Sequence, residues 1–514
     1  MAFLPHARRW RVLAVLVAWL LVPLRSGAMQ IASGHAEPGR QICLDWTRKD
    51  GKNAKPADTR NNLGIPDRDQ NRMEDARKEY EETLKTYREL ARKDPETYLP
   101  YVAATLNDLG ILDSDQNRME EARKEFEESL KIYRKLVQKD PEAYLPSVAA
   151  TLNNLGILDR DKTRMKEALK TYRELAQKDP TTYLPYVAIT RNNLGNLDIA
   201  QNLMEEARKE YEEALKIYRE LAQKNPETYL PDVATMLNNL GILDSAQNRM
   251  KEARKEYEEA LKIYRELAQK NPETYLPDVA AMLDILGNLD SAQNRMNEGR
   301  KKYEETLKIY RELAQKNPET YLPDVATMLN ILGILDSARN RMKEASKEHE
   351  EALKIFRELA QKNPETYLPY VAATLNNVGM LDRDQNRIEE ALKTYRELAQ
   401  KDPQTFRPEV ALTLNNLGIL DSAQNRMKEA RNEYEEALKT YRELAQKKPE
   451  TYLLYVAMTL NNLGILDSDQ NRMAEARKEY EEALKIYEAF AKQDPEQFTT
   501  DVKRLKKLLQ ELPK

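Results

Sequence analysis

A stretch of 46 residues recurs along most of the chain. It is clearest at residues 231–276, PDVATMLNNLGILDSAQNRMKEARKEYEEALKIYRELAQKNPETYL, and Pro277 begins the same stretch again. Self-similarity at a fixed period of this size indicates an architecture in which each repeat is one supersecondary unit. The fold class therefore depends on what one repeat forms.

One repeat has the pattern of two helices. Apolar residues from Val233 to Leu243 recur at three- and four-residue spacing, which predicts a first helix that starts at Pro231. A second run with the same spacing extends from Met250 to Ala268, and Asn271-Pro272 is expected to end it, because proline disfavours helical geometry in the residue before it.

Two residues predict how the helices meet. Gly241 stands inside the first helix, where glycine costs about 1 kcal/mol relative to alanine, so we expect another helix to pass close over it. Asn248 suits a left-handed turn after a helix. The repeat is therefore an antiparallel hairpin, and only stacked hairpins can bury both apolar stripes.

The motif residues resemble a known family. LNNLG, followed by Ala253, Tyr257 and Ala260, resembles the tetratricopeptide repeat (TPR), and the long unit is similar to the kinesin-light-chain type of that repeat. The resemblance covers residues 57–495. It implies an all-α fold, a right-handed α-solenoid (superhelix) of about ten TPR-like helical hairpins.

The glycine of each first helix marks one hairpin. Ten such glycines are Gly64, Gly110, Gly156, Gly195, Gly241, Gly287, Gly333, Gly379, Gly418 and Gly464. The step is 46 residues, except for 39 after the third and the eighth glycine. In these two repeats the second helix, as at 164–176, lacks seven residues. Seven residues are close to two helical turns, so the apolar stripe stays nearly in register, and we expect a hairpin that is shorter but not rotated. The same order of steps in both halves indicates that a block of five hairpins was duplicated.

The ends of the chain differ from the array. Residues 1–28 combine three arginines, an apolar run from Val12 to Leu24 and Ser26-Gly27-Ala28, which is typical of a secretory signal peptide. The run is short for a membrane span, so cleavage is favoured over an uncleaved anchor. Residues 29–56 have the composition of a polar linker, which contains the single cysteine, Cys43. Residues 496–514 are expected to form a C-terminal cap helix, with its apolar face at 499–512. We therefore expect an exported protein, in the periplasm, outside the cell or in the secretory pathway.

Composition excludes several classes of function. The 82 basic and 86 acidic residues are finely mixed, and without a basic block nucleic acid is not expected as a partner. The three histidines are scattered, and no zinc cluster, phosphate loop or Ser/His/Asp set can be placed. We predict no catalytic residues, no metal, no cofactor and no enzyme.

Three rows of residues recur with the repeat. The first is amide and stands two residues before LG. Its members are Asn62, Asn154, Asn193, Asn239, Asn377, Asn416 and Asn462, with a second asparagine before most of them. The family resemblance implies that they face a concave groove, where an amide can pair with the backbone of an extended peptide. The alternative is that they bond only to neighbouring helices or water.

The second row is apolar and directly follows the glycine. It comprises Ile65, Ile111, Ile157, Ile242, Ile334, Met380, Ile419 and Ile465, interrupted by Asn196 and Asn288. Ordinary helix packing is the favoured interpretation, and contact with a ligand is the alternative. Ile285 and Ile331 replace the amide of the first row in two adjacent repeats, and we predict an apolar patch there.

The third row is acidic and lies three residues after each glycine. It comprises Asp67, Asp113, Asp159, Asp198, Asp244, Asp290, Asp336, Asp382, Asp421 and Asp467. An arginine follows five residues later in nine repeats, which favours an ion pair joining the first helix to the turn over a calcium-binding row.

The sequence thus predicts an exported scaffold that binds an extended peptide of a protein partner in its groove. The alternative is a structural spacer or self-assembling element of the cell envelope without a peptide ligand.

Overall fold

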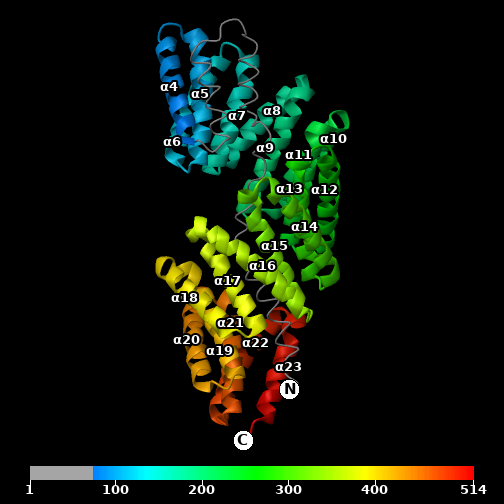
Figure 1. Ribbon diagram of the computed structural model, residues 1–514. Coiled ribbons are helices and arrows are strands. Elements are labelled where there is room, and N and C mark those ends of the chain that lie inside the picture. The colour runs from blue at the N-terminus through cyan, green and yellow to red at the C-terminus, as the bar shows by residue number, and fades with distance from the viewer. Residues whose placement is uncertain (1–72, 514) are drawn as a thin grey trace. The chain divides into compact units, whose positions relative to one another are not determined.

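A computed structural model describes residues 73–513, which fold into helices with no strand among them (Figure 1). The all-α fold predicted from the periodicity is confirmed. The predicted signal and linker, Asn62, Asp67 and the first helix of the first hairpin lie outside the described residues.

Helices follow one another with very short connections. In chain order they are α4 (Met73–Ala91), α5 (Pro95–Asp115), α6 (Met119–Val137), α7 (Pro141–Asp159), α8 (Lys162–Lys178), α9 (Pro180–Ala200), α10 (Met204–Lys224), α11 (Pro226–Ala246), α12 (Met250–Lys270), α13 (Pro272–Ala292), α14 (Met296–Lys316), α15 (Pro318–Ala338), α16 (Met342–Lys362), α17 (Pro364–Asp382), α18 (Gln385–Lys401), α19 (Pro403–Ala423), α20 (Met427–Lys447), α21 (Pro449–Asp469), α22 (Met473–Gln493) and α23 (Pro495–Glu511). Odd-numbered helices from α5 to α21 are first helices, and the even-numbered ones are second helices. The described residues form two compact units, 73–289 and 290–513, and the boundary falls within α13.

The first helices begin earlier than predicted. α11 starts at Pro226, so the expected start at Pro231 is wrong and this proline lies inside the helix. The Asn/Asp-Pro dipeptide ends one helix and also starts the next, because proline suits the first helical position. The hydrogen bond that Pro231 cannot donate would go to the carbonyl of Glu227, an exposed residue in the first turn, where solvent can replace it.

Side-chain caps fix most of these helix starts. Asp402, for example, accepts a hydrogen bond from the backbone N–H of Thr405 at 3.2 Å. Equivalent caps are made by Asp94, Asp140, Asp179, Asn271, Asn317 and Asn363. Such a cap satisfies one of the N–H groups that the first helical turn leaves without a partner.

The turn between the two helices of a hairpin has the predicted left-handed residue. Asn248 has φ of 60°, and asparagine takes the same conformation in most long repeats. Its backbone N–H donates to the carbonyl of Ser245 at 3.0 Å, and the backbone N–H of Arg249 donates to the carbonyl of Asp244 at 2.8 Å. These bonds close the end of α11 and direct the chain into α12.

The expected close approach at Gly241 is confirmed. A Cβ on this residue would lie 2.5 Å from a ring carbon of Tyr257, which is 4% exposed. Tyrosine, phenylalanine or histidine covers the glycine in the other long repeats with a described glycine contact. The glycine is therefore required by the aromatic ring of the second helix.

The short repeats lose residues from both helices and the turn, so the prediction that only the second helix shortens is wrong. α7 has 19 residues and α8 has 17, whereas α11 and α12 have 21 each. The turn reverses sooner, with Arg160 as its left-handed residue. Consequently Met165, rather than an aromatic ring, packs over Gly156, and Ile388 packs likewise over Gly379.

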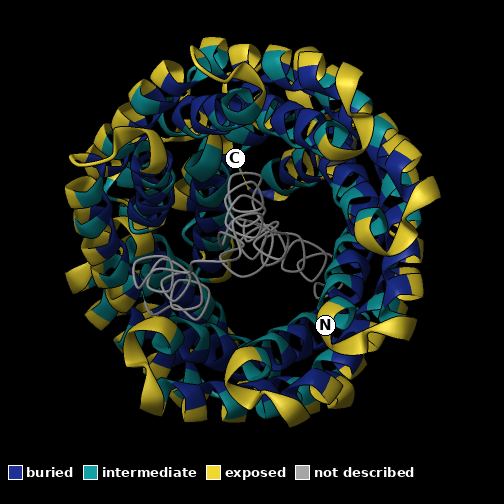
Figure 2. Cartoon of the chain, turned by 90° about the horizontal axis from the view of Figure 1, so that it is seen from above, coloured by how far each residue is buried: buried dark blue, intermediate teal, exposed yellow. Residues whose placement is uncertain are grey.

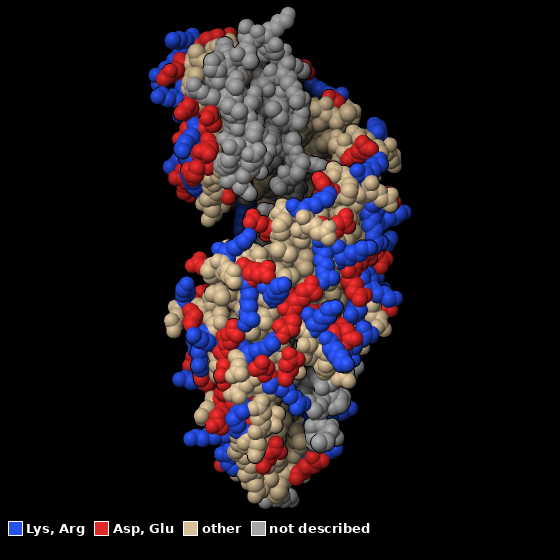
Figure 3. Space-filling model, in the orientation of Figure 1, with Lys and Arg blue, Asp and Glu red and all other residues tan. Residues whose placement is uncertain are grey.

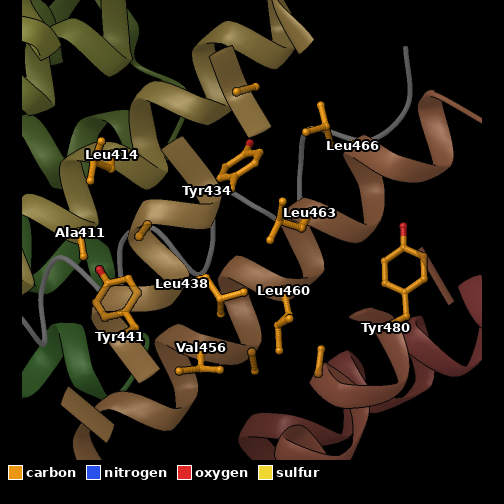
Figure 4. Packing of buried hydrophobic residues seen from close by; sticks show 14 of the residues in the cluster. Ala411, Leu414, Tyr434, Leu438, Tyr441, Val456, Leu460, Leu463, Leu466 and Tyr480 are labelled. Carbon is orange, nitrogen blue, oxygen red and sulfur yellow. The ribbon is translucent and has the colours of Figure 1, made fainter. Parts of the chain in front are cut away.

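Buried side chains form continuous clusters between successive helices within each unit. Figure 4 shows one of them, where Leu414, Tyr434 and Leu460 come from three consecutive helices, α19, α20 and α21. Figure 2 shows that buried residues lie where helices meet and that exposed residues lie on the helix faces that point away from neighbouring helices. Each hairpin thus shares its core with its neighbours, as a solenoid requires.

α23 packs on α22 at the end of the array. It starts four residues before the expected apolar face at 499–512, because Pro495 follows the capping position Asp494. Leu505 and Phe498 are buried against the last hairpin, while its lysines lie on the exposed side. Within residues 73–513, no helix is both long and apolar enough to cross a membrane.

Candidate functional site

The amide row forms bonds between neighbouring repeats. The Nδ2 of Asn239 donates to the Oδ1 of Asn192 in the preceding repeat at 2.9 Å. Asn154 donates to Asn107, Asn416 to Asn376, and Asn462 to Asn415, at 3.1–3.2 Å. In each case the second asparagine of one repeat bonds to the first asparagine of the repeat before it, which makes a ladder along the first helices. This is the structural alternative that the sequence left open, although it uses only part of each amide.

The ladder is incomplete at several predicted site residues. Asn193 is half-buried, and the Oδ1 of Asn153, which precedes it by one repeat, is buried without a hydrogen-bond partner. The Nδ2 of Asn377 and the Oδ1 of Asn238 are also buried without partners. At Asn238 the cause is chemical, since Ile285 stands where the next repeat would supply the amide donor. Ile285 and Ile331 are half-buried and belong to different units, so the predicted patch remains a prediction.

One rung of the ladder includes a histidine that the sequence analysis did not single out. Asn330 is fully buried, and its Nδ2 donates to the Oγ1 of Thr374 at 2.6 Å. The Nδ1 of His349 lies 2.9 Å from the Oδ1 of Asn330. His349 covers Gly333 in the place of the usual tyrosine, and burial lowers its pKa to about 4. A neutral imidazole is therefore the form that fits this site. The spacing of 16 residues from the glycine is the signal that could have identified it.

The apolar row divides into buried and exposed members. Ile111 and Ile334 are 8% and 7% exposed, as packing residues should be. Ile157, Ile242 and Ile465 are instead 50%, 40% and 40% exposed, among the few large apolar side chains that are exposed in the described residues. Each follows an asparagine of the amide ladder by three residues, so both lie on one helix face. The row therefore presents apolar side chains beside amides that are half-buried at Asn154 and Asn462 and buried at Asn239.

Most described members of the acidic row are buried, and the predicted ion pair with the arginine of the turn is confirmed in six repeats, at Asp159, Asp244, Asp290, Asp336, Asp421 and Asp467. Asp244 is fully buried, and the Nε of Arg249 lies 2.8 Å from its Oδ1. A second cation, which the sequence analysis missed, comes from the second helix of the preceding repeat, 36 residues earlier. Arg208 reaches Asp244 in this way, and Arg300 binds Asp336 through two nitrogens at 2.8 and 2.9 Å. Six aspartates are tied in this way to the hairpin before them, namely Asp113, Asp159, Asp198, Asp244, Asp336 and Asp467.

Exposed charges are also paired between repeats. Arg88, Arg219, Arg311, Arg396 and Arg442 each reach a glutamate 40 residues later on the next second helix. Figure 3 shows basic and acidic side chains interspersed over the visible face. Such exposed pairs contribute little stability one by one, but they leave no field of a single sign on this face to select a charged partner. Within residues 73–513, no group of three or more His, Cys, Asp or Glu could hold a metal ion.

Comparison with known proteins identifies the repeat. Profiles described as tetratricopeptide repeat match residues 57–135, 147–220, 219–266, 232–312 and 370–443, and a second such profile matches 456–489. No protein with a curated description matches the chain.

One solved structure shows the same fold at low identity, and two others have lower similarity scores. The apo form of RapI is similar with a TM-score of 0.51 and 14% identity, over 76% of this chain and 99% of that chain. BtubC (BKLC) from P. vanneervenii has a TM-score of 0.37 and 22% identity, over 48% of this chain and 92% of that one. A signal-transduction ATPase with a TPR sensor from Pyrococcus horikoshii has a TM-score of 0.43 and 15% identity, over 73% of this chain and 54% of that chain.

Proposed function

Because the chain belongs to the tetratricopeptide-repeat family, a family of scaffolds suited to protein–protein interaction, we propose that it is an exported scaffold that holds an extended segment of a partner protein. The segment lies along the first helices of the hairpins, over the amide ladder and the exposed isoleucines. The chain performs no catalysis of its own in this proposal.

The observation that carries the proposal is the exposure of Ile157, Ile242 and Ile465. A solenoid that only packed its own helices would bury these side chains, as it buries Ile111 and Ile334 in the same row. Exposed apolar side chains that recur at one position of a repeat indicate a surface for a partner. Within the unit of residues 73–289, Ile157 and Ile242 stand at the same position of two hairpins of the array, so a ligand that contacts both is an extended chain.

The ladder supplies the polar half of this surface. Asn154, Asn239 and Asn462 each use Nδ2 for one bond between repeats, and their Oδ1 atoms and second N–H groups keep hydrogen-bonding capacity. A peptide backbone offers alternating donors and acceptors to such amides. The bonds within the ladder hold the amides in place before a ligand arrives, which reduces the entropy lost on binding.

Export is the second part of the proposal, and it comes from residues 1–28. A positively charged start, an apolar run of 13 residues and a small-residue cleavage pattern direct a chain to the secretory pathway. Cell fractionation with N-terminal sequencing of the mature protein tests it. A mature N-terminus near Gln30 supports export, whereas cytoplasmic protein that retains Met1 would contradict it.

The experiment for binding replaces the exposed isoleucines with the residue that the chain itself uses there. Asn196 and Asn288 already occupy this position, so Ile157→Asn, Ile242→Asn and Ile465→Asn together preserve the fold. The control combines Met119→Asn and Leu203→Asn, two exposed apolar residues at the helix turns, 41% and 37% exposed. Partners are captured by crosslinking from the exported fraction.

Capture of a specific protein by the natural chain and by the control, with at least a tenfold loss in the triple variant, is the expected result. Equal capture by all three would overturn groove binding.

A structural spacer is the second candidate. It is favoured by the amide bonds between repeats and by the exposed Arg–Glu pairs that join successive second helices, since both stiffen an array without any ligand. This candidate is supported if none of the three proteins captures a partner and if the two variants have the same length in solution as the natural chain.

A further inference from the structure

Five repeats place a glutamate beside the buried aspartate of the acidic row. The glutamate follows the aspartate by twelve residues and comes from the second helix of the same hairpin. The pairs are Asp113 and Glu125, Asp244 and Glu256, Asp336 and Glu348, Asp421 and Glu433, and Asp467 and Glu479. The aspartates are at most 1% exposed, and in all five glutamates the Oε2 is buried without a hydrogen-bond partner.

A natural substitution in the chain shows how close these two positions are. The repeat of Asp290 has lysine instead of glutamate twelve residues later, and the Nζ of Lys302 lies 2.5 Å from the Oδ2 of Asp290. A side chain at this position therefore reaches the aspartate. Where the chain has glutamate, the same geometry brings its carboxyl group toward the aspartate, and Glu125, Glu348 and Glu433 interact with the aspartates of their own pairs.

The surrounding charges do not neutralise both carboxylates. Asp244 and Glu256 face Arg208 from α10 and Arg249 from the turn, together with Glu212 from α10 and Glu252 from α12. Four carboxyl groups thus share two guanidinium groups. One added proton would satisfy the orphaned oxygens and bring this cluster closer to neutrality.

The other four clusters have similar sets of neighbours. They are Arg77, Arg118, Glu81 and Glu121 around Glu125; Arg300, Arg341, Glu304 and Glu344 around Glu348; Arg426 and Glu389 around Glu433; and Arg431, Arg472, Glu435 and Glu475 around Glu479.

We propose that each of these five Asp–Glu pairs holds one proton in the folded array, so that the solenoid is a proton-sensitive structure that loosens as the solution becomes alkaline. The proton comes from solvent, and the protonated glutamate O–H donates to the aspartate, which keeps its ion pair with arginine. Loss of the proton leaves two adjacent carboxylates between the helices of one hairpin. The proposal does not depend on any ligand.

Burial supports this assignment at the relevant pH. Burial, with the charge of the adjacent aspartate, raises the pKa of Glu125 and Glu433 to about 8, and burial raises the pKa of Glu256, Glu348 and Glu479 to about 7. Because the folded pKa lies above the unfolded value of 4.5, the stabilisation is complete below about pH 4.5. It is lost as the pH rises through 7 to 8. The pairs titrate as units, so the values belong to each pair.

The test compares the full array with two sets of five Glu→Gln variants. The first set changes the paired glutamates at 125, 256, 348, 433 and 479, and glutamine keeps their shape and can donate a hydrogen bond. The matched control changes Glu127, Glu258, Glu358, Glu436 and Glu481, which are exposed residues of the same helices and lie outside the five clusters. Melting temperature and the infrared band of protonated carboxyl groups are measured at about pH 6.5 and about pH 8.5.

We expect the natural array and the control to have a lower melting temperature and a weaker protonated-carboxyl band at the higher pH. The paired set should have a weaker band at the lower pH, to which Glu409 still contributes because burial raises its pKa to about 7. Its melting temperature should change less between the two pH values, and it should be more stable than the natural array at pH 8.5. Lys302→Glu adds a sixth pair and should steepen the pH dependence. A natural array whose band and melting temperature do not change, or a paired set that keeps the full dependence, overturns the proposal.

Discussion

Asn239 donates its side-chain amide to Asn192 at 2.9 Å, and the two residues belong to successive repeats that are separated by 47 positions in the chain. This contact converts a pattern that the sequence shows within one repeat into a bond between repeats. It also explains why the asparagines occur in pairs, because one asparagine of a repeat donates to the preceding repeat and the other accepts from the next repeat.

Removing either partner should reveal this coupling. We expect Asn192→Ala and Asn239→Ala each to destabilise the array locally by about 1 kcal/mol, because each leaves a partly buried amide group unsatisfied. The double variant should cost less than the sum of the two. Hydrogen exchange of α9 and α11 measures the local opening free energy, which suits a long array that does not unfold in one step. Strictly additive losses would show that the ladder has no energetic role.

The buried ion pairs should matter far more than the exposed ones. Arg300→Met removes both bonds to Asp336, which is fully buried, and should cost about 3 kcal/mol because a buried charge loses its main partner. Arg311→Met on the same helix removes an exposed pair with Glu351 and should cost less than about 1 kcal/mol. Hydrogen exchange of α14 and α15 in the two variants gives the comparison, and similar losses would contradict it.

Local features of the repeat were predictable from sequence, whereas contacts between repeats were not. The left-handed turn at Asn248, the pair of Asp244 with Arg249 and the close approach at Gly241 all lie within one hairpin, so spacing alone indicates them. The second partner of Asp244, Arg208, stands 36 residues earlier, and its place depends on how far one hairpin is displaced along the next. No spacing rule within a helix gives that displacement.

The start of the first helices was mispredicted for a different reason. The apolar stripe begins at Val233, so periodicity favoured a start at Pro231, but the first turn from Pro226 is polar and has no stripe to show. This first turn is helical because Asn225 occupies the capping position and Pro226 the first helical position. The sequence analysis interpreted the Asn-Pro dipeptide only as the end of the preceding helix. The exposure of Ile157 and the burial of Ile111 could not be distinguished either, because both residues lie in the same five-residue motif, LGILD.

Gly241→Ala should destabilise the array although alanine is the better helix former. The propensity gain is about 1 kcal/mol, but the new Cβ would lie 2.5 Å from the ring of Tyr257, and such overpacking costs about 1–3 kcal/mol. The matched variant adds Tyr257→Leu, which removes the ring and should make the alanine neutral or favourable in that background. Denaturant midpoints of the four proteins of this cycle test the argument. A more stable Gly241→Ala single variant would show that the ring moves away without loss.

His349 should make the array sensitive to acid in a pH range below that of the Asp–Glu pairs. Burial lowers its folded pKa to about 4 from an ordinary value of 6.5, so the unfolded chain binds the proton more tightly. Stability from this residue is therefore complete above pH 6.5 and is lost as the pH falls toward 4. At pH 5 the loss should be about 2 kcal/mol. His349→Tyr restores the ring that most other long repeats have over this glycine and removes the titrating group. The difference in local stability between the natural array and this variant, measured by hydrogen exchange of α15 and α16, should therefore shift in favour of the variant by this amount from pH 7.5 to pH 5. A difference that stays constant over this range would mean that the imidazole is already protonated beside Asn330 or reaches solvent.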